Sequence, residues 1–170
     1  MPEEPLAYFI TFHTYGSWLH GAVSGSVDDE HNRPGTPFLR PDPERFAASR
    51  ERMTQEPYLL DESRRRIVCD AIVAECRFRG WFLHTLHVRS NHVHLVVTAA
   101  RVPEFVMRSC KANASKCLNR TGFEDPERKR WTTHGSTKYL WSADAIAEKA
   151  EYTLNGQGAP MAWFRDPGTN

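Results

Sequence analysis

The sequence of 170 residues lacks a long apolar run. The uncharged stretch at residues 5–27 is interrupted throughout by Thr, His, Ser and Gly. It therefore does not supply the roughly 20 apolar residues that a membrane-spanning helix needs. The N-terminus also lacks a basic segment followed by an apolar core, which is the pattern of a secretory signal. We expect a cytoplasmic protein with no membrane partner.

Cysteine motifs are also absent. The four cysteines include no CxxC pair, and they form two pairs spaced seven residues apart, Cys69 with Cys76 and Cys110 with Cys117. Seven residues correspond to two helical turns, so both members of a pair lie on the same helix face. We expect buried thiols in two helices, and a cysteine zinc site is the weaker alternative.

The net charge is close to zero, because the sequence has 22 basic and 21 acidic residues. No global field therefore indicates a nucleic-acid partner. The charges are unevenly spread, however: residues 101–138 hold nine basic and four acidic residues, and residues 24–63 hold five basic and nine acidic. Three basic residues of the first segment lie off the apolar stripe of a predicted helix: Arg108, Lys111 and Lys116. They form either a solvated helix face or a surface that follows a phosphate backbone.

Hydrophobic periodicity predicts the order β-α-β-β-α-β, followed by one extra helix. The expected strands cover residues 6–14, 81–88, 92–98 and 136–141, and the expected helices begin near residues 61, 103 and 142. This order is the split βαβ arrangement. We therefore expect an α+β, ferredoxin-like (RRM-like) fold in a single domain covering residues 1–170. Its antiparallel sheet should carry two helices on one face, with the third helix packed elsewhere.

Two segments depart from this pattern. Five of the eleven prolines lie within residues 20–60, which predicts a long ordered insertion with one short helix near Glu44–Thr54. A loop of this length in a compact domain usually has a function. Residues 159–170 are expected to form a loose tail.

The sharpest local feature is the run NHVHL at residues 91–95. Residues two apart in a strand face the same side, so His92 and His94 present two imidazoles together. Two neutral imidazoles at this spacing can share one divalent ion. The alternative is two half-exposed histidines on a solvent face. We expect His87 across the hairpin from His94, and His13 near the same face.

The second feature is Tyr152 in the predicted C-terminal helix. A tyrosine can act as a nucleophile and form a covalent intermediate, although its pKa near 10 makes it weak at neutral pH. A metal that withdraws charge from a target phosphate would compensate. The pattern alone also fits a packed helical tyrosine, and Tyr139 in the expected strand 136–141 is the competing nucleophile.

Together these features resemble the single-tyrosine HUH transposases, most closely the REP-associated tyrosine transposase branch. The resemblance rests on the strand at residues 8–12, the NHVHL run, the basic helix at 108–116 and the terminal helix that bears Tyr152. It covers most of the chain outside residues 20–60. The NHVHL run followed about sixty residues later by a helical tyrosine is more specific than either half.

The resemblance implies a metal-dependent transposase that cuts and rejoins single-stranded DNA on a ferredoxin-like sheet. Tyr152 would attack the scissile phosphorus, leaving a 5′-phosphotyrosine and a free 3′-hydroxyl. His92 and His94 would hold Mg²⁺ or Mn²⁺. The implied partner is single-stranded DNA from hairpin-forming repeats, and the implied location is the nucleoid of a prokaryotic cytoplasm. Family members work as monomers or as homodimers.

Related transposases often place a third polar metal ligand one helical turn after the tyrosine, where this sequence has Gly156. Gln157 and Asn155 are the two candidates for that role. In an unbroken helix Asn155 lies nearer the tyrosine face. We favour Gln157, because the glycines on either side of it can unwind the helix end and redirect it.

Two other functions remain open at this stage. One is a non-catalytic nucleic-acid-binding module, in which aromatics such as Tyr8, Phe12 and Trp81 stack on bases as in an RNA-recognition sheet. The other is a metal-dependent nuclease that uses water as its nucleophile, with Tyr152 merely packed.

Overall fold

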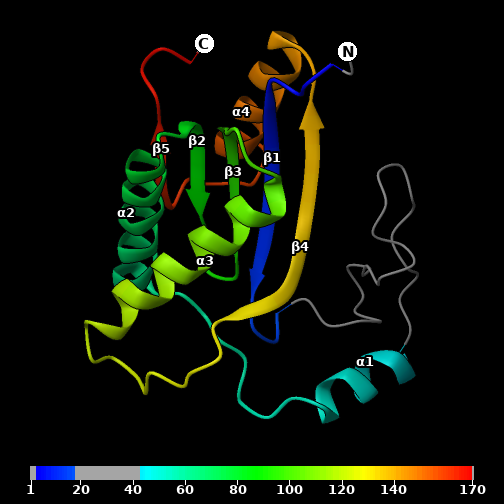
Figure 1. Cartoon of the computed structure of the whole chain (residues 1–170). Coiled ribbons are helices and arrows are strands. Elements are labelled where there is room, and N and C mark those ends of the chain that lie inside the picture. Colours follow the sequence, from blue (N-terminus) through cyan, green and yellow to red (C-terminus); the bar gives the residue numbers. More distant parts are fainter. Residues whose placement is uncertain (1–2, 18–42, 170) are drawn as a thin grey trace.

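A five-stranded antiparallel sheet organises the chain (Figure 1). The computed structural model describes residues 3–17 and 43–169. The strands are β1 (Ala7–Thr14), β2 (Phe82–Val88), β3 (His92–Thr98), β4 (Trp131–Leu140) and β5 (Ala162–Arg165), in the spatial order β4-β1-β3-β2-β5. The helices are α1 (Pro43–Glu51), α2 (Glu62–Arg79), α3 (Pro103–Asn119) and α4 (Ala143–Asn155). None of these described helices combines the length and the apolar composition needed to cross a membrane.

The predicted α+β fold is confirmed, since β1 to β4 with α2 and α3 follow the βαββαβ order and α4 is the extra helix. Helix α1 lies within the region predicted to hold a short helix, whereas residues 18–42 of the expected insertion lie outside the described residues. Strand β4 begins at Trp131, five residues before the expected start.

The loose tail predicted for residues 159–170 is wrong for residues 162–165. They form β5, which pairs antiparallel with β2 and places Phe164 opposite Leu86. Ala162 and Phe164 also pack against the main hydrophobic core. The tail is therefore ordered by contacts with residues almost eighty positions away.

The two faces of the sheet differ because successive side chains of a strand point to opposite sides. One face carries the main core beneath α2 and α3 (Figure 1). Its strand residues include Tyr8, Ile10, Phe12, Val93, Leu95 and Val97. The other face packs against α4 through a smaller cluster: Ala7, Phe9, Val96 and Leu140, with Ala145 and Ile146 beside them. This alternation puts the histidines of β1 and β3 on the α4 face.

The ends of α2 and α4 lie at capping residues that the sequence supplies. The Asp61 side chain accepts a hydrogen bond from the Arg64 backbone N–H and so begins α2. Gly80 ends that helix with a left-handed φ of 71°, a conformation that favours glycine. The Ser142 hydroxyl accepts a hydrogen bond from the Ala145 N–H at 3.1 Å. This cap fixes the start of α4, the helix that bears Tyr152.

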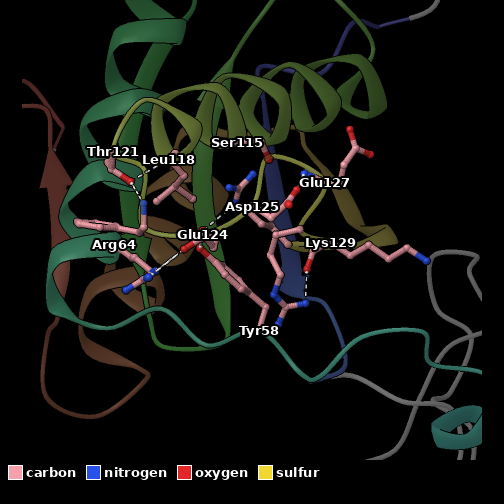
Figure 2. Close-up of polar contacts among 12 residues, drawn as sticks. Tyr58, Arg64, Ser115, Leu118, Thr121, Glu124, Asp125, Glu127 and Lys129 are labelled. Carbon is pink, nitrogen blue, oxygen red and sulfur yellow. Dashed lines mark hydrogen bonds and ion pairs between the residues drawn. The ribbon is translucent and has the colours of Figure 1, made fainter.

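A polar cluster holds the connector between α3 and β4 in place (Figure 2). The Glu124 carboxylate accepts hydrogen bonds from the Tyr58 hydroxyl at 2.7 Å, from Arg64 Nη2 at 2.9 Å and from Arg130 Nε at 3.0 Å. Arg130 is 3% exposed. Burial opposes ionisation of Glu124, but these three donors outweigh it and hold the pKa of the carboxyl below its ordinary value.

We predict that Glu124→Gln lowers the free energy of unfolding by roughly 3–5 kcal/mol, because it leaves the buried Arg130 without a counter-charge. The pKa of Glu124 is lower in the folded chain, so its stabilisation is present above the ordinary value of 4.5 and is lost as pH falls below it. Urea unfolding at pH 7 and near pH 4 should show a smaller acid-induced loss in the variant than in the wild type. Asp125→Asn, at an exposed neighbour, is the control, and an equal acid loss in Glu124→Gln and the wild type would contradict the prediction.

Candidate active site

Two histidines, a tyrosine and a glutamine meet on the α4 face of the sheet. The ring centroids of His92 and His94 on β3 are 4.7 Å apart. The ring of Tyr152, from α4, lies 6.0 Å from that of His94. Just beyond α4, Gln157 Nε2 donates a hydrogen bond to the Tyr152 hydroxyl oxygen at 2.6 Å. The fold thus brings together four residues from two segments that are about sixty positions apart.

The Nδ1 atom of each of the two histidines lies within hydrogen-bond distance of a neighbouring side chain. His92 Nδ1 lies 2.7 Å from Asn91 Oδ1, and His94 Nδ1 lies 2.7 Å from Thr11 Oγ1. An amide oxygen only accepts, so His92 Nδ1 donates and its Nε2 carries a lone pair. The hydroxyl of Thr11 can accept from His94 in the same way. Hydrogen bonds of this kind orient metal-binding imidazoles and fix their tautomer.

The imidazoles on this face are neutral at pH 7. Burial and then the adjacent His92 lower the pKa of His94, against a hydrogen bond with Gln157 that raises it, and the net result is a pKa of about 3. Burial also lowers the pKa of His92, again against a hydrogen bond with Gln157. His13 pairs with His92 across β1 and β3, and burial lowers its pKa to about 4. Neutral imidazole is the form that binds metal ions.

Of the two candidates for a third ligand, only Gln157 faces the histidines. Its side chain contacts His92, His94 and the Tyr152 hydroxyl. The Asn155 amide instead donates to Glu151 Oε1, one turn back on the exposed side of α4. The structure therefore brings Gln157 to the site and leaves Asn155 away from it.

Gly156 stands at the position where the resemblance implies a third ligand, and there is a physical reason for a glycine there. A Cβ at this position would lie 2.6 Å from Tyr152 Cδ2 and 2.8 Å from the Tyr152 carbonyl oxygen. The Gly156 N–H donates to that same carbonyl at 2.9 Å. Because Gly156 has no side chain, the Tyr152 ring can pack against the C-terminal end of α4.

The residues present fit a small divalent cation. The donor set is mixed: the two imidazole nitrogens suit first-row transition ions, whereas the amide oxygen, with water or phosphate oxygens to complete the shell, suits Mn²⁺ or Mg²⁺. Within residues 3–17 and 43–169, no three His, Cys, Asp or Glu side chains are grouped so as to hold a metal ion. A metal at this place therefore depends on the Gln157 amide in addition to His92 and His94.

His87 is a residue of this face whose role the sequence did not show. It is fully buried and lies opposite His94 in the β2–β3 pairing, as expected. Its Nδ1 donates to the Thr153 carbonyl at 2.9 Å, and its Nε2 accepts from the Met161 N–H at 2.9 Å. His87 thus connects β2 to Thr153, before Gln157, and to Met161, after it. These two hydrogen bonds fix the position of the segment that carries Tyr152 and Gln157.

We predict that His87→Ala lowers the free energy of unfolding by about 1–3 kcal/mol, because the buried Thr153 carbonyl and the half-buried Met161 N–H lose their partner. The control is His84→Ala, which removes a half-buried histidine of the same strand whose ring nitrogens pair with the hydroxyls of Thr98 and Thr169. Urea unfolding of both variants measures the difference. Equal destabilisation in the two would contradict a specific role for His87.

The predicted nucleic-acid-binding residues Arg108, Lys111 and Lys116 lie on α3, across the sheet from Tyr152. Lys111 Nζ donates to the carbonyls of Thr132 at 2.8 Å and His134 at 3.3 Å, and burial lowers its pKa to about 8. Lys111 therefore holds β4, whereas Arg108 and Lys116 are exposed. The structure does not bring these three residues to His92 and His94, and their contact with DNA stays a prediction.

The aromatic residues considered as alternatives lie elsewhere. Tyr8, Phe12 and Trp81 are buried in the core beneath α2 and α3, so the expectation that they stack on bases is wrong. Tyr139, the competing nucleophile, lies on β4 with its ring 5.5 Å from Tyr8. It is therefore on the face opposite the histidines.

Three comparisons with known proteins give one kind of match, to a solved structure. No family model matches the sequence, and no curated protein matches it. Among solved structures, one of a REP-associated tyrosine transposase bound to a REP hairpin is similar, with a TM-score of 0.48 and 9% sequence identity. The match covers 89% of this chain and 66% of that chain. Nothing about this chain is argued from this likeness, and its function is argued from the site.

Proposed function

We propose that the protein is a metal-dependent transesterase of transposase type that cuts and rejoins single-stranded DNA through a 5′-phosphotyrosine. One observation carries this proposal: the Tyr152 hydroxyl, hydrogen-bonded to Gln157, stands beside the buried His94 and its half-buried neighbour His92, two imidazoles of lowered pKa on one face of the sheet. A nucleophile and a cation site at such close range are the two components that phosphoryl transfer requires.

In this proposal Tyr152 is the nucleophile. Its oxygen attacks the scissile phosphorus, the bond from phosphorus to the 3′ oxygen breaks, and the tyrosine proton ends on the departing 3′-hydroxyl. The 5′ phosphate stays on Tyr152, so a 3′-hydroxyl can later reverse the step without an external energy source. The side chain is 41% exposed, which leaves room for a phosphodiester to reach the hydroxyl.

The other residues of the site would bind the metal ion and orient the reacting groups. His92, His94 and Gln157 would ligate Mg²⁺ or Mn²⁺, and a bound divalent ion neutralises charge on a phosphate. Gln157 would also keep the tyrosine hydroxyl in place, and Thr11 and Asn91 would fix the two imidazoles. All of these groups lie together within one chain, so the proposed chemistry needs no residue of a second chain.

The proposal is tested with 5′- and 3′-labelled single strands taken from repeats that flank the gene. The strands are incubated with the protein in Mn²⁺ or in EDTA and run on a denaturing protein gel. A covalent adduct that forms in Mn²⁺ and is absent in EDTA supports the proposal. Cleavage without an adduct would replace it with a water-using nuclease, and binding without cleavage would replace it with a binding module.

A further inference from the structure

Three arginines surround one phenylalanine ring at the end of the sheet remote from the histidines. The guanidinium carbons of Arg101, Arg108 and Arg79 lie 3.9, 5.6 and 5.7 Å from the ring centroid of Phe105. Arg79 is the last residue of α2, Arg101 follows β3, and Arg108 belongs to α3. Residues from three segments therefore concentrate positive charge around one aromatic ring.

A pocket of about 350 Å³ lies at this cluster. Its lining consists of arginine, aromatic and small residues with no carboxylate among them: Arg79, Gly80, Trp81, Ala100, Arg101 and Phe105. The positive end of α3 points to the same region, and Val102 at its N-cap has no side-chain oxygen to satisfy the first N–H groups.

The positive charge of the cluster is only partly balanced. Arg79 Nε pairs with Glu75 Oε1 at 2.9 Å. Among the described residues, no carboxylate lies within ion-pair distance of Arg101 or Arg108, which are both exposed. Like charges held together repel, and an anion placed between them relieves that repulsion. Arginine guanidiniums bind phosphate oxygens in a bidentate manner.

Aromatic surface stands beside the charge. Phe78, next to Arg79, is 80% exposed, and its ring lies 5.7 Å from the Arg79 guanidinium. Phe105 is half-buried beneath the three arginines. Exposed rings beside guanidiniums form the combination by which proteins bind single-stranded nucleic acid, since the rings stack on bases while the arginines contact the backbone.

We propose that this arginine–phenylalanine cluster (Arg79, Arg101, Arg108, Phe78 and Phe105) binds a single-stranded segment of the DNA substrate, with a phosphate on the arginines and an unpaired base on Phe78. The inference rests on the proposed function for its choice of ligand. Arg101 follows the end of β3, and Thr98 at that end lies four strand residues, or roughly 13 Å, beyond His94. The cluster therefore holds a part of the strand that is not cut.

The test is the binding of fluorescein-labelled oligothymidylate, followed by anisotropy across a salt series in EDTA, where no cleavage takes place. The variant Arg101→Gln/Arg108→Gln is expected to bind about tenfold more weakly. The slope of log K against log salt should fall by about 0.7 for each phosphate that the variant no longer neutralises. The matched control, Arg52→Gln/Arg66→Gln, also removes two exposed arginines and should stay within about twofold of the wild type.

Phe78→Ala tests the stacking part. It should weaken binding about fivefold with an unchanged salt slope, because stacking releases no counterions. If the arginine variant and its control have the same affinity and the same salt slope, the proposal that this cluster binds DNA is wrong. Wild-type affinity in Phe78→Ala would overturn the stacked base.

The two proposals can fail separately. If the wild-type protein forms the metal-dependent adduct but the arginine variant binds like its control, the cluster is not a binding site and the transesterase stands. If the wild type forms no adduct but the arginine variant loses binding, the cluster stands as a nucleic-acid site and the proposed chemistry is wrong.

Discussion

Replacing Tyr152 with phenylalanine is expected to abolish the covalent protein–DNA adduct, with a loss of at least about 10³-fold, because the substitution removes the attacking oxygen. The ring itself can stay where it is, 6.0 Å from both the Phe9 and His94 rings. The hydrogen bond to Gln157 that disappears is exposed, so the free energy of unfolding should change by less than about 1 kcal/mol. Quantitative denaturing gels measure the adduct, and urea unfolding confirms the fold.

Tyr139→Phe is the matched control for this prediction. It removes the same oxygen from an exposed tyrosine on β4, across the sheet from the histidines, and it should leave the adduct unchanged. DNA cleavage that persists in Tyr152→Phe would mean that water, and not the tyrosine, is the nucleophile.

Removing one imidazole from the histidine pair is expected to weaken Mn²⁺ binding by more than tenfold and to slow adduct formation by about 10²–10³-fold. His92→Ala is the first choice, since His92 is less buried than His94 and its removal disturbs the core less. Loss of a histidine ligand should cost at least as much as loss of its hydrogen-bond partner, which typically lowers metal affinity 10–100-fold. Isothermal titration with Mn²⁺ measures metal affinity apart from cleavage when the histidine variant also carries Tyr152→Phe. The double variant and Tyr152→Phe alone are titrated with DNA bound.

His84→Ala serves as the control for the histidine variant. His84 lies on β2, where it contacts Thr98 and Thr169 and takes no part in the cluster around Tyr152. Its removal should leave Mn²⁺ affinity and the rate of adduct formation within about twofold. Unchanged Mn²⁺ affinity in His92→Ala would exclude this histidine from the metal site.

Local patterns determine much of the fold and of the candidate site. Alternation along β3 is enough to put His92 and His94 on one face, because side-chain direction in a strand has a period of two. Capping by Asp61 and Ser142 is equally local. The glycines around Gln157 indicate that the helix end can be redirected, and the structure has that side chain beside Tyr152.

Other features depend on contacts that no local pattern encodes. Alternation in β1 separates two faces of the strand but does not tell which face is open, and helices pack on both faces of this sheet. For that reason the sequence leaves Tyr8 and Phe12 available for base stacking, although they lie in the core. Strand β5 has only four residues and acquires its structure by pairing with β2.

The same limit applies to single side chains whose partners are distant in sequence. The role of His87 follows from the placement of Thr153 and Met161, which only the packed α4 provides. In the sequence Lys111 is one more positive charge on a helix, yet its ammonium donates to two carbonyls of β4. A helical wheel predicts which side chains share a face, but it does not predict the neighbours that satisfy them.

The central claim is that Tyr152 becomes covalently joined to DNA, and peptide mapping of the adduct tests it most directly. Wild-type protein is incubated with single-stranded DNA in Mn²⁺, and the adduct is digested with nuclease and trypsin and analysed by mass spectrometry. Trypsin releases Tyr152 in the peptide Ala150–Arg165, where it is the only tyrosine, and releases Tyr139 in the separate peptide Tyr139–Lys149. We predict a nucleotide linked through its 5′ phosphate to Tyr152 and formed only with the metal. A nucleotide on Tyr139, or cut DNA without any modified peptide, would contradict the account.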